Sequence, residues 1–131
     1  MSSNKQAQNQ EKQKSPPKHG AAWGTWLVLI MLHGIGAIAL AYTIKLEPEF
    51  ANSRNLILAS LSVAAILQVV SAIGLWLWKR WGLYLYVVVV FIQMAAHMVL
   101  TASVFVGFYD AIPLLITGYM INYNQRIKHF N

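Results

Sequence analysis

Four strongly polar side chains lie inside stretches of this sequence that are otherwise apolar. They are His33, Gln68, Gln93 and His97. Gln93 and His97 are one helical turn apart, so both fall on the same face of a helix. Polar and ionisable groups are costly inside a membrane, and they are candidates for a functional role there. We therefore treat the four residues as a candidate intramembrane polar cluster, for which we consider three interpretations.

The first kind of chemistry is haem binding through the two histidines. Two axial ligands of one b-type haem must lie at the same depth on facing helices. Counted from Gly24 and Gly82, His33 lies about 9 residues and His97 about 15 residues deep, a difference of roughly 9 Å along the helix axes. This difference argues against a shared iron, so we predict no cofactor. A haem- or pigment-binding membrane subunit remains the third alternative.

The second kind of chemistry is proton relay or substrate contact in a small homo-oligomeric transporter or channel. Histidine suits this role because its charge changes near physiological pH. Proton-coupled carriers commonly use carboxylates, however, and we assign all four acidic residues to a tail or to loops. They are Glu11, Glu47, Glu49 and Asp110.

The third interpretation is structural. Interhelical hydrogen bonds in membranes contribute about 0.6–2 kcal/mol each, so the four polar residues would form a clasp between helices. We favour this clasp. We predict no catalytic residues and no metal site.

The amino-acid composition indicates that these residues lie in a membrane protein and not in a water-soluble domain. Of 131 residues, 57% are hydrophobic and 11% are charged, whereas soluble domains carry about 25% charged residues. The formal charge of +6 would suggest a nucleic-acid partner in a soluble protein, but membrane topology explains it better, and we predict no nucleic-acid binding. The chain has no cysteine, which excludes disulfides, Fe–S clusters and thiol catalysis.

Apolar runs of membrane-spanning length predict an all-α, four-helix transmembrane bundle with up-down-up-down topology. The polar residues 1–20 predict a disordered basic tail, and residues 21–131 predict the transmembrane domain. Its helices are expected at about 23–44, 56–78, 82–106 and 111–127. The last boundary rests on Gly107 as a helix stop, Asp110 as an N-cap and Pro113 in the following first turn.

A short basic and aromatic turn is predicted between the second and third helices. Lys and Arg avoid hydrocarbon and Trp favours the headgroup layer, so we expect a lipid headgroup interface here, formed by Trp76, Trp78, Lys79, Arg80 and Trp81. Four helices put all ten Lys and Arg residues on one side of the membrane except Lys45 and Arg54. The positive-inside rule then places both termini in the cytoplasm.

The same turn carries a resemblance. Gly74-Leu75-Trp76, Lys79-Arg80-Trp81-Gly82 and Tyr84, followed by Pro113-Leu114-Leu115 and a basic, aromatic end, look like small prokaryotic four-helix integral membrane proteins of unknown function. The resemblance implies four helices and a bacterial inner (cell) membrane. It implies no activity and no site residues.

From the sequence we expect a non-enzymatic accessory, assembly or interaction subunit of a larger membrane complex. The reason is that the spans suit packing and contain no carboxylate, cysteine or catalytic set. The expected partners are membrane lipids and either other membrane subunits or a second copy of the chain. The transporter or channel is the main alternative.

Overall fold

Four long helices account for nearly all of the described structure. The computed structural model describes residues 19–43, 52–123 and 126–131. The helices are α2 (Ala21–Thr43), α3 (Arg54–Trp76), α4 (Arg80–Thr101) and α5 (Val104–Tyr123), and a 3-10 turn, η2 (Arg126–His129), follows them. Of the predicted disordered tail at residues 1–20, residues 1–18 lie outside the described residues.

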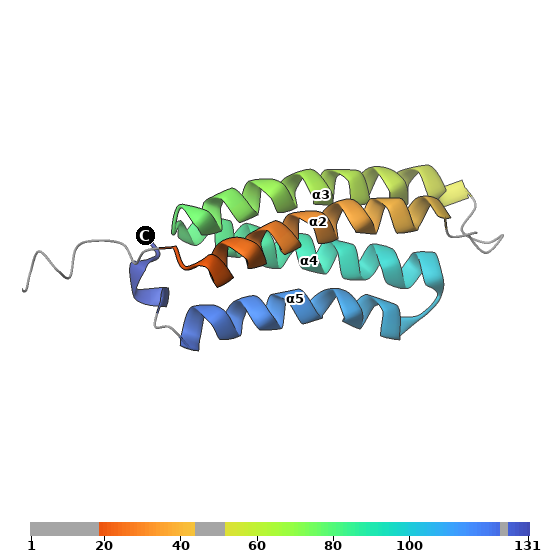
Figure 1. Cartoon of the computed structure of the whole chain (residues 1–131). Helices are drawn as coiled ribbons and strands as arrows, with labels where there is room; N and C mark the ends of the chain where they lie inside the picture. Colours follow the sequence, from red (N-terminus) through yellow and green to blue (C-terminus); the bar gives the residue numbers. More distant parts are fainter. Residues whose placement is uncertain (1–18, 44–51, 124–125) are drawn as a thin grey trace, which may run out of the picture.

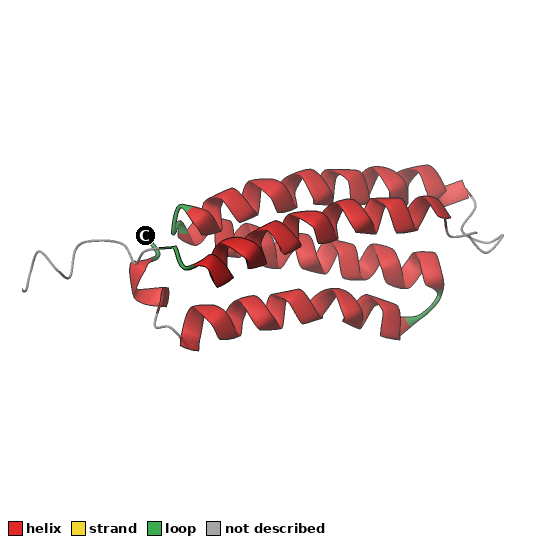
Figure 2. Ribbon diagram, in the orientation of Figure 1, coloured by secondary structure: helices red, strands yellow, loops and turns green. Residues whose placement is uncertain are grey.

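The helices form an up-and-down bundle in which each packs against the next one along the chain (Figures 1 and 2). Each is about 30–35 Å long at 1.5 Å per residue, which matches the hydrocarbon thickness of a bilayer. All four are long and apolar enough to cross a membrane. The predicted all-α, four-span fold is therefore confirmed, and the chain has the architecture of a multi-pass membrane protein.

The two ends of the bundle differ. The terminal end carries the start of α2, the turn between α3 and α4, and η2 (Figure 1). The far end carries the end of α2, the start of α3 and the turn between α4 and α5. Each end has its own apolar core cluster. The terminal-end cluster includes Trp23, Leu27, Ile30, Leu75, Trp78, Tyr86 and Val90. The far-end cluster consists of Ala41, Ile57, Leu61, Ala96 and Leu100.

Glycines allow α3 and α4 to approach closely beside their connecting turn. A Cβ atom added to Gly74 would lie 2.7 Å from the Cα atom of Gly82, and one added to Gly82 would lie 2.6 Å from the carbonyl carbon of Gly74. Backbone atoms cannot move aside as a side chain can. The tight hairpin therefore requires the absence of a side chain at both positions.

The boundary between the last two helices differs from the prediction. α4 ends at Thr101, because Ala102 takes the left-handed conformation that closes it (φ 49°), and α5 begins at Val104. Gly107 lies inside α5 and packs against Met98 of α4, where a Cβ atom would overlap the methionine side chain. The predicted helix stop at Gly107, the N-cap at Asp110 and the first-turn position of Pro113 are therefore wrong.

Candidate functional site

Asp110 lies at the centre of a buried polar cluster and not in a loop. It sits in the second turn of α5 and is 3% exposed. Its Oδ2 atom is 2.6 Å from His97 Nδ1, and its Oδ1 atom is 3.5 Å from His33 Nε2. One carboxylate thus connects histidines of α2 and α4 to α5. The expectation that no acidic residue lies within a span is wrong.

The cluster lies within the membrane-spanning part of the bundle, closer to the far end. At 1.5 Å per residue, Asp110 is about 9 Å from the start of α5, and His97 is about 6 Å from the end of α4. His33 lies near the middle of α2. These depths place the carboxylate inside the candidate membrane spans, and isolated charges are expensive in a membrane interior.

The hydrogen bonds determine which nitrogen of each histidine carries a proton. An ionised carboxylate only accepts hydrogen bonds, so Nδ1 of His97 donates to Asp110 Oδ2 at 2.6 Å, whereas Nε2 of His33 lies at ion-pair distance, 3.5 Å from Asp110 Oδ1. Nδ1 of His33 then accepts from Gln68 Nε2, which is 3.5 Å away. This histidine consequently connects the carboxylate to the glutamines.

The glutamines continue the network to the backbone of α2. Gln68 Nε2 donates to the Ile30 carbonyl at 2.7 Å, and Gln93 Nε2 donates to Gln68 Oε1 at 2.7 Å. Both amides are fully buried. Because a carbonyl can only accept, the Ile30 contact fixes the orientation of the Gln68 amide and, through it, that of Gln93.

Gly34 makes room for this arrangement. A Cβ atom at Gly34 would lie 2.9 Å from Gln68 Oε1 and 3.1 Å from Gln68 Cδ. The short sequence Gly34-Ile35-Gly36 thus contains one glycine at a close helix contact. Gly36 faces open space, since a Cβ atom there would meet nothing within 4 Å.

Two buried atoms of the cluster have no hydrogen-bond partner within the part of the chain that the structure describes. They are Nε2 of His97 and Oε1 of Gln93. Both residues belong to α4 and are one helical turn apart, so their side chains lie on the same face. Unpartnered buried polar atoms are rare in proteins and call for an explanation.

A partly open cleft of about 180 Å³ adjoins Asp110. Its lining combines the three titratable groups of the cluster with small, aliphatic and aromatic side chains from α2 and α5. The lining residues are His33, Gly36, Ala37, Leu40, His97, Val106, Tyr109 and Asp110. Pockets for drug-sized ligands usually measure about 300–1,000 Å³, so this cleft fits only a small molecule.

The structure brings all four predicted cluster residues into one network. Gln68 contacts His33 and Gln93 directly, whereas His97 joins the others through Asp110. Both histidine rings turn toward one carboxylate, which supplies no pair of facing axial ligands for a haem.

The sequence prediction of a loop at Asp110 is wrong, since this residue lies inside α5. The buried positions Gly107, Asp110, Thr117 and Ile121 share one face at helical spacing. That periodicity starts well before the proline and could have placed Asp110 within a helix.

The predicted interface residues separate into two groups. Trp76 and Trp81 are exposed at 42% and 47%, as a lipid-facing aromatic belt requires. Trp78 is only 4% exposed and is a core residue. Its ring stacks on Trp23 at 5.5 Å and meets the edge of Phe130 at 5.3 Å.

The two cations of the interface contact the end of the described chain. Arg80 Nε donates to the Phe130 carbonyl at 3.0 Å, and Lys79 Nζ donates to Asn131 Oδ1 at 3.4 Å. These contacts hold the segment after α5 against the turn between α3 and α4. Lipid headgroup binding at this turn stays a prediction.

Comparisons with protein-family models, with curated proteins and with solved structures found no match to this chain. The resemblance to small prokaryotic membrane proteins therefore extends to the four long apolar helices and identifies no family.

Proposed function

We propose that this protein is a small, non-enzymatic membrane transporter or channel that is coupled to protons through Asp110, His33 and His97. The observation that carries the proposal is the buried carboxylate bridging two histidines on three different helices. Intramembrane carboxylate and histidine groups are typical of proton relays in pumps and transporters. The expectation of an accessory subunit depended on spans without a carboxylate, and Asp110 removes that premise.

Charge balance supports a bound proton at this site. Asp110 is the only acidic residue that the described ranges contain. An ionised aspartate with two neutral histidines leaves a net negative charge in a medium where charge is poorly solvated. One added proton makes the cluster neutral overall, as an ion pair between Asp110 and a histidinium.

The two unpartnered atoms indicate which ring takes the proton. A neutral His97 that donates from Nδ1 has only a lone pair at Nε2, and the Oε1 atom of Gln93 is also an acceptor. Two acceptors cannot bond to each other. A protonated His97 carries N–H at both positions, so its Nε2 becomes a donor on the same helix face as the Gln93 Oε1 acceptor.

For orientation, we propose that the terminal end faces the cytoplasm of a bacterial cell, because Lys79, Arg80 and Lys128 lie there. The carboxylate would then be closer to the outer surface than to the inner one. Protons would reach the cluster from outside over the shorter distance.

Nitrogen NMR of the two buried histidines tests the proposal. The sample is the full chain in lipid with ¹⁵N-labelled histidine, in which His19 and His129 are replaced by glutamine. We expect one imidazolium signal at neutral pH, and we expect Asp110→Asn to convert it to a neutral imidazole. Ser60→Ala is the control, because its hydroxyl bonds only to the Ile57 carbonyl of its own helix. Two neutral imidazoles in the starting protein would contradict the proposal.

Proton flux gives a second measurement. Liposomes containing the protein and a trapped pH indicator are given a potassium diffusion potential. We expect proton movement that falls at least about tenfold in Asp110→Asn, as for the loss of a general acid or base. Equal rates in the two proteins would contradict the proposal.

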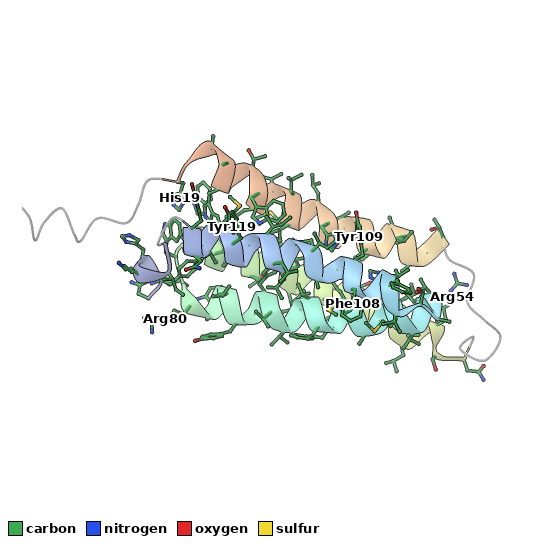
Figure 3. All side chains as sticks on the ribbon, turned by 90° about the horizontal axis from the view of Figure 1, so that it is seen from below. His19, Arg54, Arg80, Phe108, Tyr109 and Tyr119 are labelled. Atoms are coloured by element: carbon green, nitrogen blue, oxygen red, sulfur yellow. The ribbon has the colours of Figure 1, made fainter. Side chains whose placement is uncertain are left out.

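The accessory or assembly subunit remains a second proposal, favoured by the outer face of α5. Phe105, Phe108, Tyr109 and Tyr119 are 59–88% exposed on this helix, and Figure 3 labels the last three. Aromatic side chains are enriched where proteins contact one another. Purification in mild detergent separates the two proposals, because co-elution with a larger complex supports the subunit, whereas a stable homo-oligomer supports the transporter.

A further inference from the structure

The cleft beside Asp110 is lined almost entirely by apolar surface, with a few polar atoms from three residues. The three titratable residues in its lining are His33, His97 and Asp110. The rest of the lining comes from Gly36, Ala37, Leu40, Val106 and Tyr109. Pockets that combine an apolar body with a few convergent polar groups are typical of small-molecule sites.

The position of the cleft indicates the side from which it is reached. Its lining residues on α2 extend from His33 toward Thr43, and those on α5 lie between Val104 and Asp110. All of them therefore belong to the far half of the bundle. Figure 3 looks onto α5, with α2 along one flank and α4 along the other.

On the terminal side of the cluster a side-chain hydrogen bond joins α2 to α5. Trp26 Nε1 of α2 donates to Thr117 Oγ1 of α5 at 2.9 Å. Leu27 and Ile30 are at most 2% exposed beside this contact. A ligand consequently enters from the far half, between α2 and α5.

The charge of the cluster selects the ligand. Without its proton, the site carries one negative charge and needs one positive charge in return. An inorganic cation prefers a shell of several oxygen ligands, and no group of three or more His, Cys, Asp or Glu in the described ranges is arranged to hold a metal ion. An organic ammonium ion would pair with the carboxylate and place its apolar body against the alkyl walls.

We propose that this cleft binds a small primary ammonium ion with an apolar body, in exchange for the proton held by the cluster. The inference rests on the proposed proton-linked function and names its substrate class. The incoming ammonium group donates hydrogen bonds to the Asp110 carboxylate, and Tyr109 adds an aromatic ring, whose face attracts cations. As the ammonium enters, the histidinium releases its proton to the surrounding water, so one positive charge leaves for each one that binds.

Gly36 provides a way to fill the cleft without disturbing the bundle. It lines the cleft, and a side chain there would meet nothing within 4 Å of its Cβ atom. Gly118 of α5 has the same open surroundings but does not line the cleft. Leucine at each position therefore makes a matched pair of variants, of which only Gly36→Leu obstructs the site.

The experiment uses the full chain in detergent and benzylammonium chloride as the probe, because this cation joins a primary ammonium group to a small flat ring. Equilibrium dialysis measures binding, and an indicator dye in weakly buffered solution measures released protons. We expect saturable binding with up to one proton released for each cation bound. The apparent Kd should rise about tenfold for each unit of falling pH where the empty site is protonated.

Four comparisons define the site. Asp110→Asn should weaken binding at least about 30-fold, because it removes the charge that pairs with the ligand. Gly36→Leu should weaken binding at least about tenfold, whereas Gly118→Leu should bind as the starting protein does. Benzyl alcohol has the same shape without the charge and should bind at least about tenfold more weakly.

Failure of this inference can be told apart from failure of the proposed function. Absence of saturable binding, binding without proton release, or equal affinities of Gly36→Leu and Gly118→Leu would each overturn the ammonium site. The NMR signal of the histidinium requires no ligand. If that signal is present and depends on Asp110 while benzylammonium does not bind, the proton-linked function stands without this substrate class.

Discussion

Two glycines of α2 are important because they lack a side chain. Gly34 gives Gln68 access to the backbone of α2, and Gly36, one residue beyond Ile35, leaves the cleft open. The sequence places both glycines in one motif and does not distinguish their roles. Their difference depends on which helix passes each face of α2, and that is a property of the whole bundle.

Comparing alanine at these two glycines separates the roles. Both substitutions improve helix propensity by up to about 1 kcal/mol, so their difference reports the local contact. We expect Gly34→Ala to be less stable than Gly36→Ala by about 1–3 kcal/mol, because it displaces Gln68 from the Ile30 carbonyl. Unfolding of the detergent-solubilised protein by added SDS measures the difference, and equal stabilities would contradict the proposed packing.

The glutamine pair gives a second prediction at this scale. Gln68→Leu leaves the buried Nε2 atom of Gln93 without its acceptor, which should reduce the free energy of unfolding by about 1–3 kcal/mol. The double variant Gln68→Leu, Gln93→Leu removes both partners and should recover most of that loss. A double variant that is less stable than the single one would show that the amide contact is not the main effect. The same SDS unfolding measurement applies.

The helices themselves were largely predictable, and their connections were not. Apolar length and the flanking charged residues located four spans, because lipid permits few alternatives to a continuous helix. The sequence predicts that α4 ends at about residue 106, whereas it ends at Thr101. The reason is that Ala102, and not a glycine, takes the left-handed conformation. The preference for glycine just after a helix favours a stop at Gly107. In the structure Gly107 instead lies inside α5 and packs against Met98.

That misplaced boundary also decided how much of the candidate site could be predicted. The four polar residues of the spans were found because they interrupt apolar runs. Asp110 was missed because aspartate, followed by proline, is a common sequence at the start of a helix. Only the helical spacing of the buried positions along α5 distinguishes an aspartate inside a helix from an aspartate at the start of one.

The hairpin of α3 and α4 provides a prediction about a pair of helices. Gly82→Ala would place a Cβ atom 2.6 Å from the carbonyl carbon of Gly74 and 2.7 Å from the backbone nitrogen of Leu75. The helices must separate, and we expect a loss of about 1–3 kcal/mol, as for an overpacked core. Gly118→Ala is the control, since its surroundings are open. SDS unfolding that leaves both variants equally stable would contradict the close contact.

At the scale of the whole molecule, the segment that follows α5 packs against the turn between α3 and α4 at the terminal end of the bundle. The backbone nitrogen of Asn131 donates to the Trp78 carbonyl at 3.0 Å, and the backbone nitrogen of Arg80 donates to the Asn131 carbonyl at 3.1 Å. Phe130 is 3% exposed against Trp78. The end of the chain therefore connects α5 to the hairpin of α3 and α4.

Removing the buried ring should loosen this end of the bundle. We expect Phe130→Ala to lower the free energy of unfolding by up to about 3 kcal/mol through the cavity that it leaves. It should also increase hydrogen exchange of the backbone amides of Arg80 and Asn131. Ile127→Ala, at a position that is 57% exposed in η2, is the control. Unchanged exchange in Phe130→Ala would show that the segment does not depend on this contact.

Pro113 removes one backbone hydrogen bond from α5, the helix that contains Asp110. A proline has no amide hydrogen, so the carbonyl of Tyr109, one turn earlier, lacks its normal helical donor. The backbone of α5 is therefore least restrained beside Asp110, and helices bend at such points. A bend at this point would change the position of the Asp110 carboxylate relative to the two imidazoles, so the place of Pro113 in the sequence bears directly on the geometry of the polar cluster.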